Sequence, residues 1–107
     1  MSLHADAIQE IEALCPDAAV VEADGLTYIH LPRLVLPDET AVEALLCLSG
    51  RDGYSTRLFL SRKVAAKGAN WSVHRILDKA WNTWSWNNVP ATLRPIEVLM
   101  SHLDGLR

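Results

Sequence analysis

The stretch WSVHRILDKAWNTWSW, Trp71 to Trp86, decides the predicted fold because it holds all four tryptophans of the chain. Apolar residues recur in it at the spacing of one helix face: Val73, Ile76, Leu77, Ala80, Trp81 and Trp84. This periodicity predicts an amphipathic helix. Trp81 and Trp84 lie on its apolar stripe, so we expect both side chains in the hydrophobic core.

The sequence before this stretch predicts a short helix followed by two β-hairpins. Apolar residues recur at helical spacing over residues 2–15, and Pro16 disfavours continuation of that helix. Residues 18–31 then place β-branched and aromatic residues on both sides of Asp24-Gly25, a dipeptide that favours a tight hairpin turn. A second pair of apolar runs, separated by a segment rich in turn formers, follows in residues 41–61.

The sequence after this stretch predicts a final helix. Pro95 would lie in its first turn and Gly105 at its end. The apolar stripe of this helix consists of Leu93, Ile96, Leu99, Met100 and Leu103. We therefore expect one α+β domain over residues 1–107, with an N-terminal helix, an antiparallel four-stranded meander and two C-terminal helices.

Composition indicates a globular domain of a cytoplasmic protein. Half of the 107 residues are hydrophobic, which argues against disorder, and no apolar run reaches the length of a membrane span. The N-terminal segment carries Asp6 and Glu10 where a signal peptide would be basic. Cys15 and Cys47 lie far apart and form no CxxC motif, so we expect no metal site and no cofactor.

Charge is divided unevenly between the two halves of the chain. Residues 1–50 carry nine acidic residues and one basic residue, and residues 51–107 carry nine basic residues and four acidic ones. Several bases precede or follow Trp71: Arg57, Arg62, Lys63, Lys67, Arg75 and Lys79. Basic grooves with aromatic residues bind single-stranded nucleic acid. The net charge of −3 and the absence of a recognised nucleic-acid motif disfavour that partner.

Cys47 and His74 are the candidate catalytic residues. Cys47 lies within the apolar run ALLCLS, where we expect a buried and unreactive thiol. His74 falls near the start of the expected Trp-rich helix, where a helix N-terminus would favour the neutral imidazole. The alternative for His74 is an ordinary exposed residue, because it lies off the apolar stripe.

Two segments resemble the ubiquitin-conjugating (UBC) domains and their bacterial relatives. The first is AVEALLCLSGRDGYSTRLFLS, in which Gly53-Tyr54 occupies the place of the turn in the family's meander. The second is WNTWSWNNVPATLRPIEVLMSHLDGL, which is similar to the Trp-rich tail and closing helix of the bacterial families. The resemblance covers residues 25–105 and implies a UBC-like fold and a role in a bacterial ubiquitin-like conjugation pathway.

The chain departs from the UBC pattern at the catalytic position. Residues 61–88 contain neither a cysteine nor the family's His-Pro-Asn segment, and His74 is the one residue there that titrates near neutral pH. The resemblance therefore implies a homologue that binds a ubiquitin-like protein and its activating enzyme without forming a thioester. The alternative within the family is that Cys47 is the nucleophile.

The same resemblance implies a partner-binding surface beside the Trp-rich segment. Trp71 and Trp86 would frame it, and nearby bases would complete it: Lys63, Lys67 and Arg75. The alternative function is a small binding module outside that pathway, whose partner is a protein or single-stranded nucleic acid.

Overall fold

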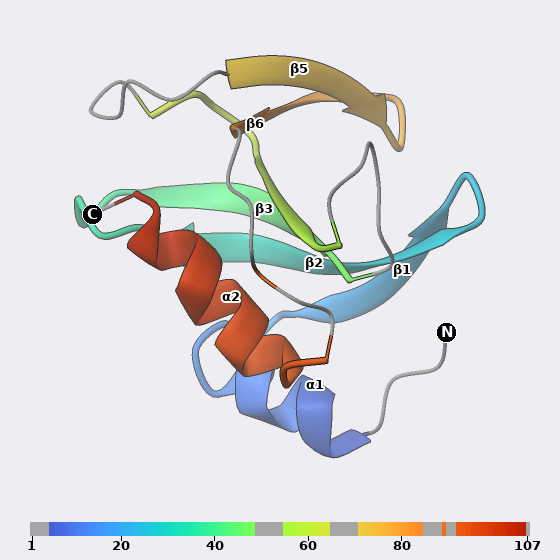
Figure 1. Ribbon diagram of the computed structural model, residues 1–107, viewed down its shortest axis with the longest axis vertical. Helices are drawn as coiled ribbons and strands as arrows, with labels where there is room; N and C mark the ends of the chain where they lie inside the picture. Colours follow the sequence, from blue (N-terminus) through green and yellow to red (C-terminus); the bar gives the residue numbers. More distant parts are fainter. Residues whose placement is uncertain (1–4, 49–54, 65–70, 85–88, 90–91, 107) are drawn as a thin grey trace.

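A six-stranded antiparallel sheet and two helices make up the described part of the computed structural model, which comprises residues 5–48, 55–64, 71–84, 89 and 92–106 (Figure 1). The elements in chain order are α1 (Ala5–Glu12), β1 (Ala19–Ala23), β2 (Leu26–Val35), β3 (Ala41–Cys47), β4 (Arg57–Leu60), β5 (Trp71–Ile76), β6 (Lys79–Trp84) and α2 (Pro95–Asp104). The strand order in the sheet is β1-β2-β3-β4-β6-β5.

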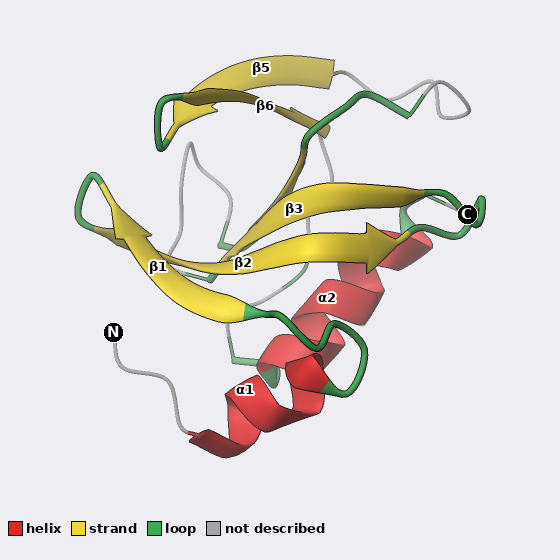
Figure 2. Cartoon of the chain, turned by 180° about the vertical axis from the view of Figure 1, so that it is seen from behind, coloured by secondary structure: helices red, strands yellow, loops and turns green. Residues whose placement is uncertain are grey.

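Strands β1 to β4 form an antiparallel meander, with each strand beside the next one in the sequence. The β1–β2 turn has φ angles of 52° at Asp24 and 78° at Gly25, which is the conformation that this dipeptide favours. Both predicted hairpins are thus confirmed. The two helices lie together on one face of the meander (Figure 2).

The predicted helix over Val73 to Trp84 is wrong, because these residues form the β5–β6 hairpin. Strand pairing runs from Trp71 opposite Trp84 to Ile76 opposite Lys79. The two-residue turn is Leu77-Asp78, with φ angles of 54° and 60°. The helical spacing of apolar residues was coincidental, since Val73, Leu77 and Ala80 are exposed and do not share a buried face. The β-branched and aromatic residues of the stretch favour strands instead.

The sheet bends sharply at β4. In the described residues, strands β4 and β6 are paired at one position, with Leu60 opposite Asn82. Beyond that joint the β5–β6 hairpin lies over the face of β2 and β3 that points away from the helices (Figure 1). The fold thus has three layers: the helices, the meander and the folded-over hairpin.

Each face of the meander has its own hydrophobic core. The helix-side core includes Ile29, Leu46, Trp84 and Leu99. The hairpin-side core is smaller and consists of Tyr28, Leu45, Cys47, Phe59, Ile76 and Trp81. Trp81 and Trp84 are 1% and 2% exposed, so their predicted burial is confirmed. Their separation of three residues along a strand places them on opposite faces of the sheet.

The predicted fold class is therefore wrong in two respects. The sheet has six strands where a four-stranded meander was expected, and the described residues contain one C-terminal helix where two were expected. The UBC-like architecture inferred from the resemblance depended on the second helix. That helix is replaced by the β5–β6 hairpin, which supplies the last two strands of the sheet.

Candidate functional site

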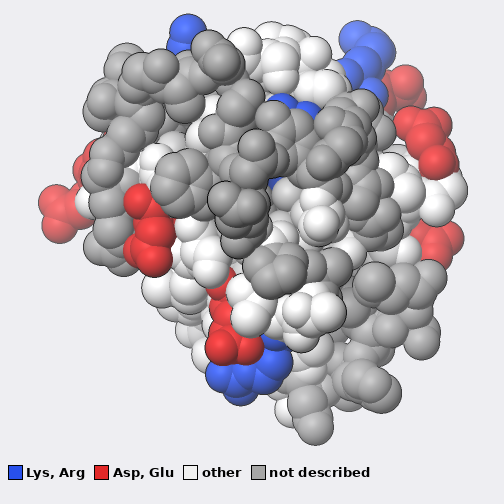
Figure 3. Space-filling model, in the orientation of Figure 1, with Lys and Arg blue, Asp and Glu red and all other residues white. Residues whose placement is uncertain are grey.

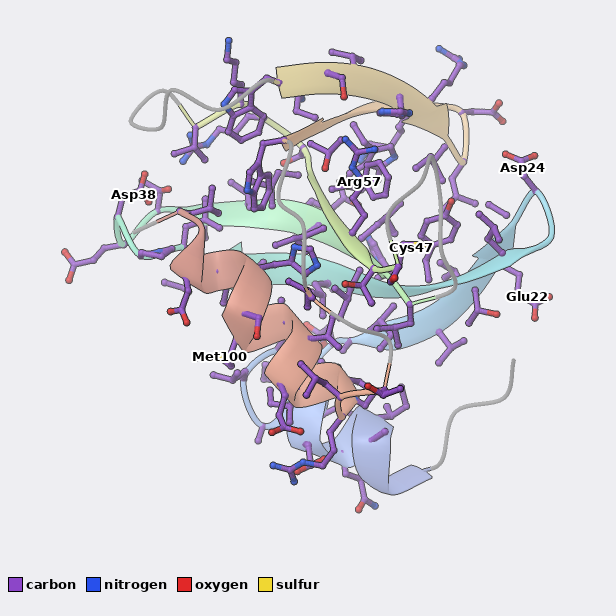
Figure 4. All side chains as sticks on the ribbon, in the orientation of Figure 1. Glu22, Asp24, Asp38, Cys47, Arg57 and Met100 are labelled. Atoms are coloured by element: carbon purple, nitrogen blue, oxygen red, sulfur yellow. The ribbon has the colours of Figure 1, made fainter. Side chains whose placement is uncertain are left out.

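Cys47 is sealed inside the hairpin-side core. It is the last residue of β3, opposite Tyr28 of β2 and Arg57 of β4, and its exposed fraction is 0%. Figure 4 shows Cys47 and Arg57 between the meander and the β5–β6 hairpin. A thiol that attacks a protein substrate must reach the surface. Cys47 does not meet this requirement in the folded chain.

His74 lies on β5, the last strand of the sheet, where it is half-buried. Its ring meets the edge of the Phe59 ring at a centroid separation of 5.6 Å, and its Nε2 is 3.1 Å from Ser72 Oγ. The expected influence of a helix N-terminus does not apply here, because residues 71–76 form a strand. A half-buried histidine packed on phenylalanine is typical of a structural side chain.

The predicted partner-binding residues have different environments. Lys63 and Arg75 are exposed, and Arg75 Nη2 donates a hydrogen bond of 3.3 Å to the carbonyl oxygen of Asp78. Trp71 is half-buried, with its ring 5.4 Å from that of Trp84. Lys67 and Trp86 lie outside the described residues.

Arg57 does not belong to an exposed basic patch. It is 5% exposed and projects into the space between the meander and the hairpin. Its Nε donates to Thr83 Oγ1 over 3.2 Å, and the Thr83 hydroxyl donates to the carbonyl oxygen of Leu58 over 2.8 Å. These two buried hydrogen bonds link β4 to β6 beside the bend in the sheet.

A second polar cluster ties the hairpin to the meander and was not predicted from the sequence. His30 Nε2 lies 2.7 Å from Glu43 Oε2, and Lys79 of β6 forms an ion pair with Oε1 of the same carboxylate. Hydrogen bonds from Lys79 and His30 hold the pKa of Glu43 below its usual value. All three side chains are partly exposed, and one acidic residue joins three strands.

A third polar group lies in the helix-side core. Thr56 Oγ1 donates to the carbonyl oxygen of Val89 (2.8 Å) and also lies 2.9 Å from His102 Nε2. Because the single hydroxyl hydrogen is used on Val89, Nε2–H of His102 must be the donor to Thr56. Burial, and to a lesser extent the positive charge of Arg57, lower the pKa of His102 to about 4. His102 is therefore a neutral structural histidine.

The turns of the two outer hairpins face each other across a cleft of about 370 Å³. Its lining comes from the β1–β2 turn and the β5–β6 hairpin: Ala23, Asp24, Arg75, Leu77 and Asp78. Figure 3 shows acidic and basic side chains side by side on that side of the molecule. The mixed charges of the cleft make it a poor site for a small apolar ligand.

The outer surface of the β5–β6 hairpin combines apolar and basic character. Val73, Arg75 and Leu77 follow one another at every second residue, and Val73 and Leu77 are 65% and 45% exposed. We call these three residues the hairpin strip. Leu77 adopts a left-handed backbone conformation, which glycine, asparagine and aspartate tolerate better than other residues do.

The described residues contain no group of three or more histidine, cysteine, aspartate or glutamate side chains placed to hold a metal ion. None of the helices in the described ranges is long and apolar enough to cross a membrane. A scan against protein-family models, a search of curated proteins and a search of solved structures each found no match to this chain.

Proposed function

We propose that this chain is a protein-binding component that forms no thioester, acting with a ubiquitin-like protein and its activating enzyme. The observation that carries the non-catalytic part is the complete burial of Cys47. Cys15, the other cysteine, is 1% exposed, and its Sγ–H donates to the carbonyl oxygen of Arg33. Neither thiol is accessible to a macromolecular donor. The support for the pathway is the sequence resemblance in residues 25–105.

The hairpin strip is the surface that we assign to partner binding. Its two exposed apolar side chains flank a guanidinium, and the hairpin beneath is anchored by Trp81 and by the ion pair of Lys79 with Glu43. A strand and turn that present apolar and cationic groups fit a partner surface with an apolar patch beside a carboxylate.

Single-stranded nucleic acid is less well supported by the geometry. Stacking needs exposed aromatic faces, whereas Trp81 and Trp84 are buried and Trp71 packs against Trp84. Among the described bases of the predicted patch, Arg57 is buried and Lys79 is paired with Glu43.

The test is reconstitution with a candidate ubiquitin-like protein, its activating enzyme and ATP, followed by size-exclusion chromatography and intact-mass measurement without reductant. We expect a complex that contains the chain at unchanged mass. A thiol-sensitive adduct that disappears in Cys47→Ala would contradict the non-catalytic assignment. Absence of any complex would contradict the assignment to a ubiquitin-like pathway.

Charge variants of the hairpin strip locate the surface. Val73→Glu should weaken the complex about tenfold, as expected for removal of one apolar contact. Val20→Glu is the matched control, because Val20 is also an exposed strand valine, 47% accessible, on the opposite edge strand β1. Equal effects of the two substitutions would exclude the strip as the interface.

A further inference from the structure

An apolar groove of about 300 Å³ lies on the helix side of the molecule, away from the hairpin strip. It is formed by the turn that follows α1, the end of β2 with its following turn, and the second half of α2. Its lining is apolar throughout: Leu14, Leu34, Val35, Leu36, Pro37, Met100 and Leu103. Three segments distant in the sequence therefore contribute to one surface feature.

The exposed apolar side chains of the chain are concentrated at this groove. Leu14, Val35 and Met100 are 53%, 56% and 39% exposed, and they are three of the six large exposed hydrophobic residues in the described ranges. Single exposed hydrophobic residues are common, but several that converge on one concave surface indicate a binding site. Methionine adds an adaptable side chain that fits apolar partners of varied shape.

The groove is preformed by fixed backbone. Leu34, Leu36 and Leu103 are buried in the helix-side core and form its floor. The turn after β2 is closed by hydrogen bonds of 2.8 Å from Leu36 N to Thr40 O and 2.9 Å from Glu39 N to Leu36 O. A preformed site loses less conformational entropy when a partner binds.

The segments that form the groove are acidic. Residues 12–17, 33–40 and 97–104 hold one Lys or Arg, namely Arg33, against six acids: Glu12, Asp17, Asp38, Glu39, Glu97 and Asp104. Figure 4 places Asp38 and Met100 on the same side of the molecule, and Figure 3 shows acidic side chains gathered there.

Basic residues from elsewhere offset this charge in part. Arg94 pairs with Glu97, and Arg62 bonds Thr40 and lowers the pKa of Asp38 through its charge, after the larger effect of hydrogen bonds from Thr40. Glu12, Asp17 and Glu39 are exposed in the segments that form the groove, as is Arg33, and the charge of these segments remains net negative.

We propose that this groove binds a basic amphipathic helix of a partner protein. Apolar side chains at i, i+3, i+4 and i+7 of the ligand would enter the groove, and flanking Lys or Arg residues would face the acidic residues of the segments that form it. The proposal is independent of the hairpin strip, which lies on the other side of the meander.

The probe is a fluorescein-labelled helical peptide of about 15 residues with apolar residues at those positions and Lys or Arg elsewhere. Its fluorescence anisotropy is titrated with the full chain. The matched peptide replaces every base by Glu and keeps the apolar residues. We expect the basic peptide to bind at least about tenfold more tightly, with an affinity that falls as salt rises. Equal affinities, or no binding of either peptide, would overturn the proposal.

Two sets of variants locate the binding site. Met100→Glu should weaken binding of the basic peptide about tenfold, whereas Val20→Glu should leave its affinity unchanged. The double variant Glu39→Lys/Asp104→Lys keeps the apolar lining and should shift preference toward the acidic peptide. Glu22→Lys/Asp24→Lys on the β1–β2 hairpin makes the same change in net charge and is the control. Equal shifts in the two double variants would contradict binding at the groove, as would unchanged affinity in Met100→Glu.

Discussion

Thr56 and His102, 46 residues apart in the chain, are joined by a 2.9 Å hydrogen bond in which the imidazole Nε2–H is the donor. The contact links the residue before β4 to the last turn of α2 inside the helix-side core. Burial, and after it the Arg57 charge, lower the pKa of His102 to about 4, so the imidazole is neutral in the folded chain at pH 7.

The chain should lose stability in mild acid because of His102. The folded-state pKa of about 4 lies below the ordinary value of 6.5, so the folded state binds fewer protons than the unfolded state between these values. Stability from this group is complete above pH 6.5 and declines as the pH falls toward 4, by roughly 3 kcal/mol in total. Thermal melts at pH 7 and pH 5 measure the decline.

The variant His102→Gln isolates that effect. Its side-chain amide retains a donor toward Thr56 and does not titrate. The difference in melting temperature between pH 7 and pH 5 should be smaller in the variant than in the natural chain. An identical difference would assign the acid sensitivity to other groups.

Glu43→Gln should loosen the β5–β6 hairpin without unfolding the chain. The substitution removes the ion pair with Lys79 and weakens the contact with His30. Because these side chains are partly exposed, the expected cost is about 0.5–1 kcal/mol. Hydrogen exchange of the amides of β5 and β6 should become faster. Faster exchange confined to β1 would contradict the role of Glu43 as a tether.

Trp81→Ala should cost about 3–5 kcal/mol of unfolding free energy, as expected for a buried aromatic residue. Trp81 is 1% exposed, and its Nε1–H donates a 2.9 Å hydrogen bond to the carbonyl oxygen of Ile76. Val73→Ala on the same hairpin is the comparison and should cost less than about 0.5 kcal/mol, because Val73 is exposed. Chemical denaturation of both variants gives the two values, and similar values would contradict the assigned core.

Leu77→Asn should stabilise the chain by about 1 kcal/mol. Leu77 has a φ of 54° in the hairpin turn, and asparagine tolerates that conformation better than leucine does. If the hairpin strip binds a partner, the same variant should weaken the complex. A variant with a lower melting temperature than the natural chain would show that the Leu77 side chain stabilises the fold.

Cys47 should not react with thiol reagents in the folded chain, because its exposed fraction is 0%. Mass spectrometry after brief treatment with iodoacetamide should show no modification of the native chain and two modified cysteines in denaturant. Modification of Cys47 under native conditions would reopen the question of catalysis.

Local patterns in the sequence were sufficient to predict α1, the two hairpins of the meander and α2. Asp24-Gly25 strongly favours a turn, and Pro95 and Gly105 mark the ends of α2. The burial of Cys47 followed from its apolar run, whereas the burial of Trp81 and Trp84 was predicted correctly from a helical stripe that the structure does not contain.

The β5–β6 hairpin could not be predicted in the same way. Leu77-Asp78 is an unusual pair for a turn with two positive φ angles, so it gave no sign that the chain reverses there. Apolar residues before and after the turn happened to match a helical spacing. The contacts of Glu43 with Lys79 and of Thr56 with His102 join residues 36 and 46 positions apart, and no local pattern encodes them.

The joint between Leu60 and Asn82 is the narrowest connection in the described part of the sheet. The meander and helices share the larger core, to which the hairpin contributes Trp84, whereas most of the hairpin's buried contacts lie in the smaller core and in side-chain tethers. Opening of the hairpin alone would break few ladder bonds and would uncover Cys47, Phe59 and Tyr28 together. We therefore expect local opening to begin at the same joint that lets the sheet fold over itself, with the β5–β6 turn opening before the meander.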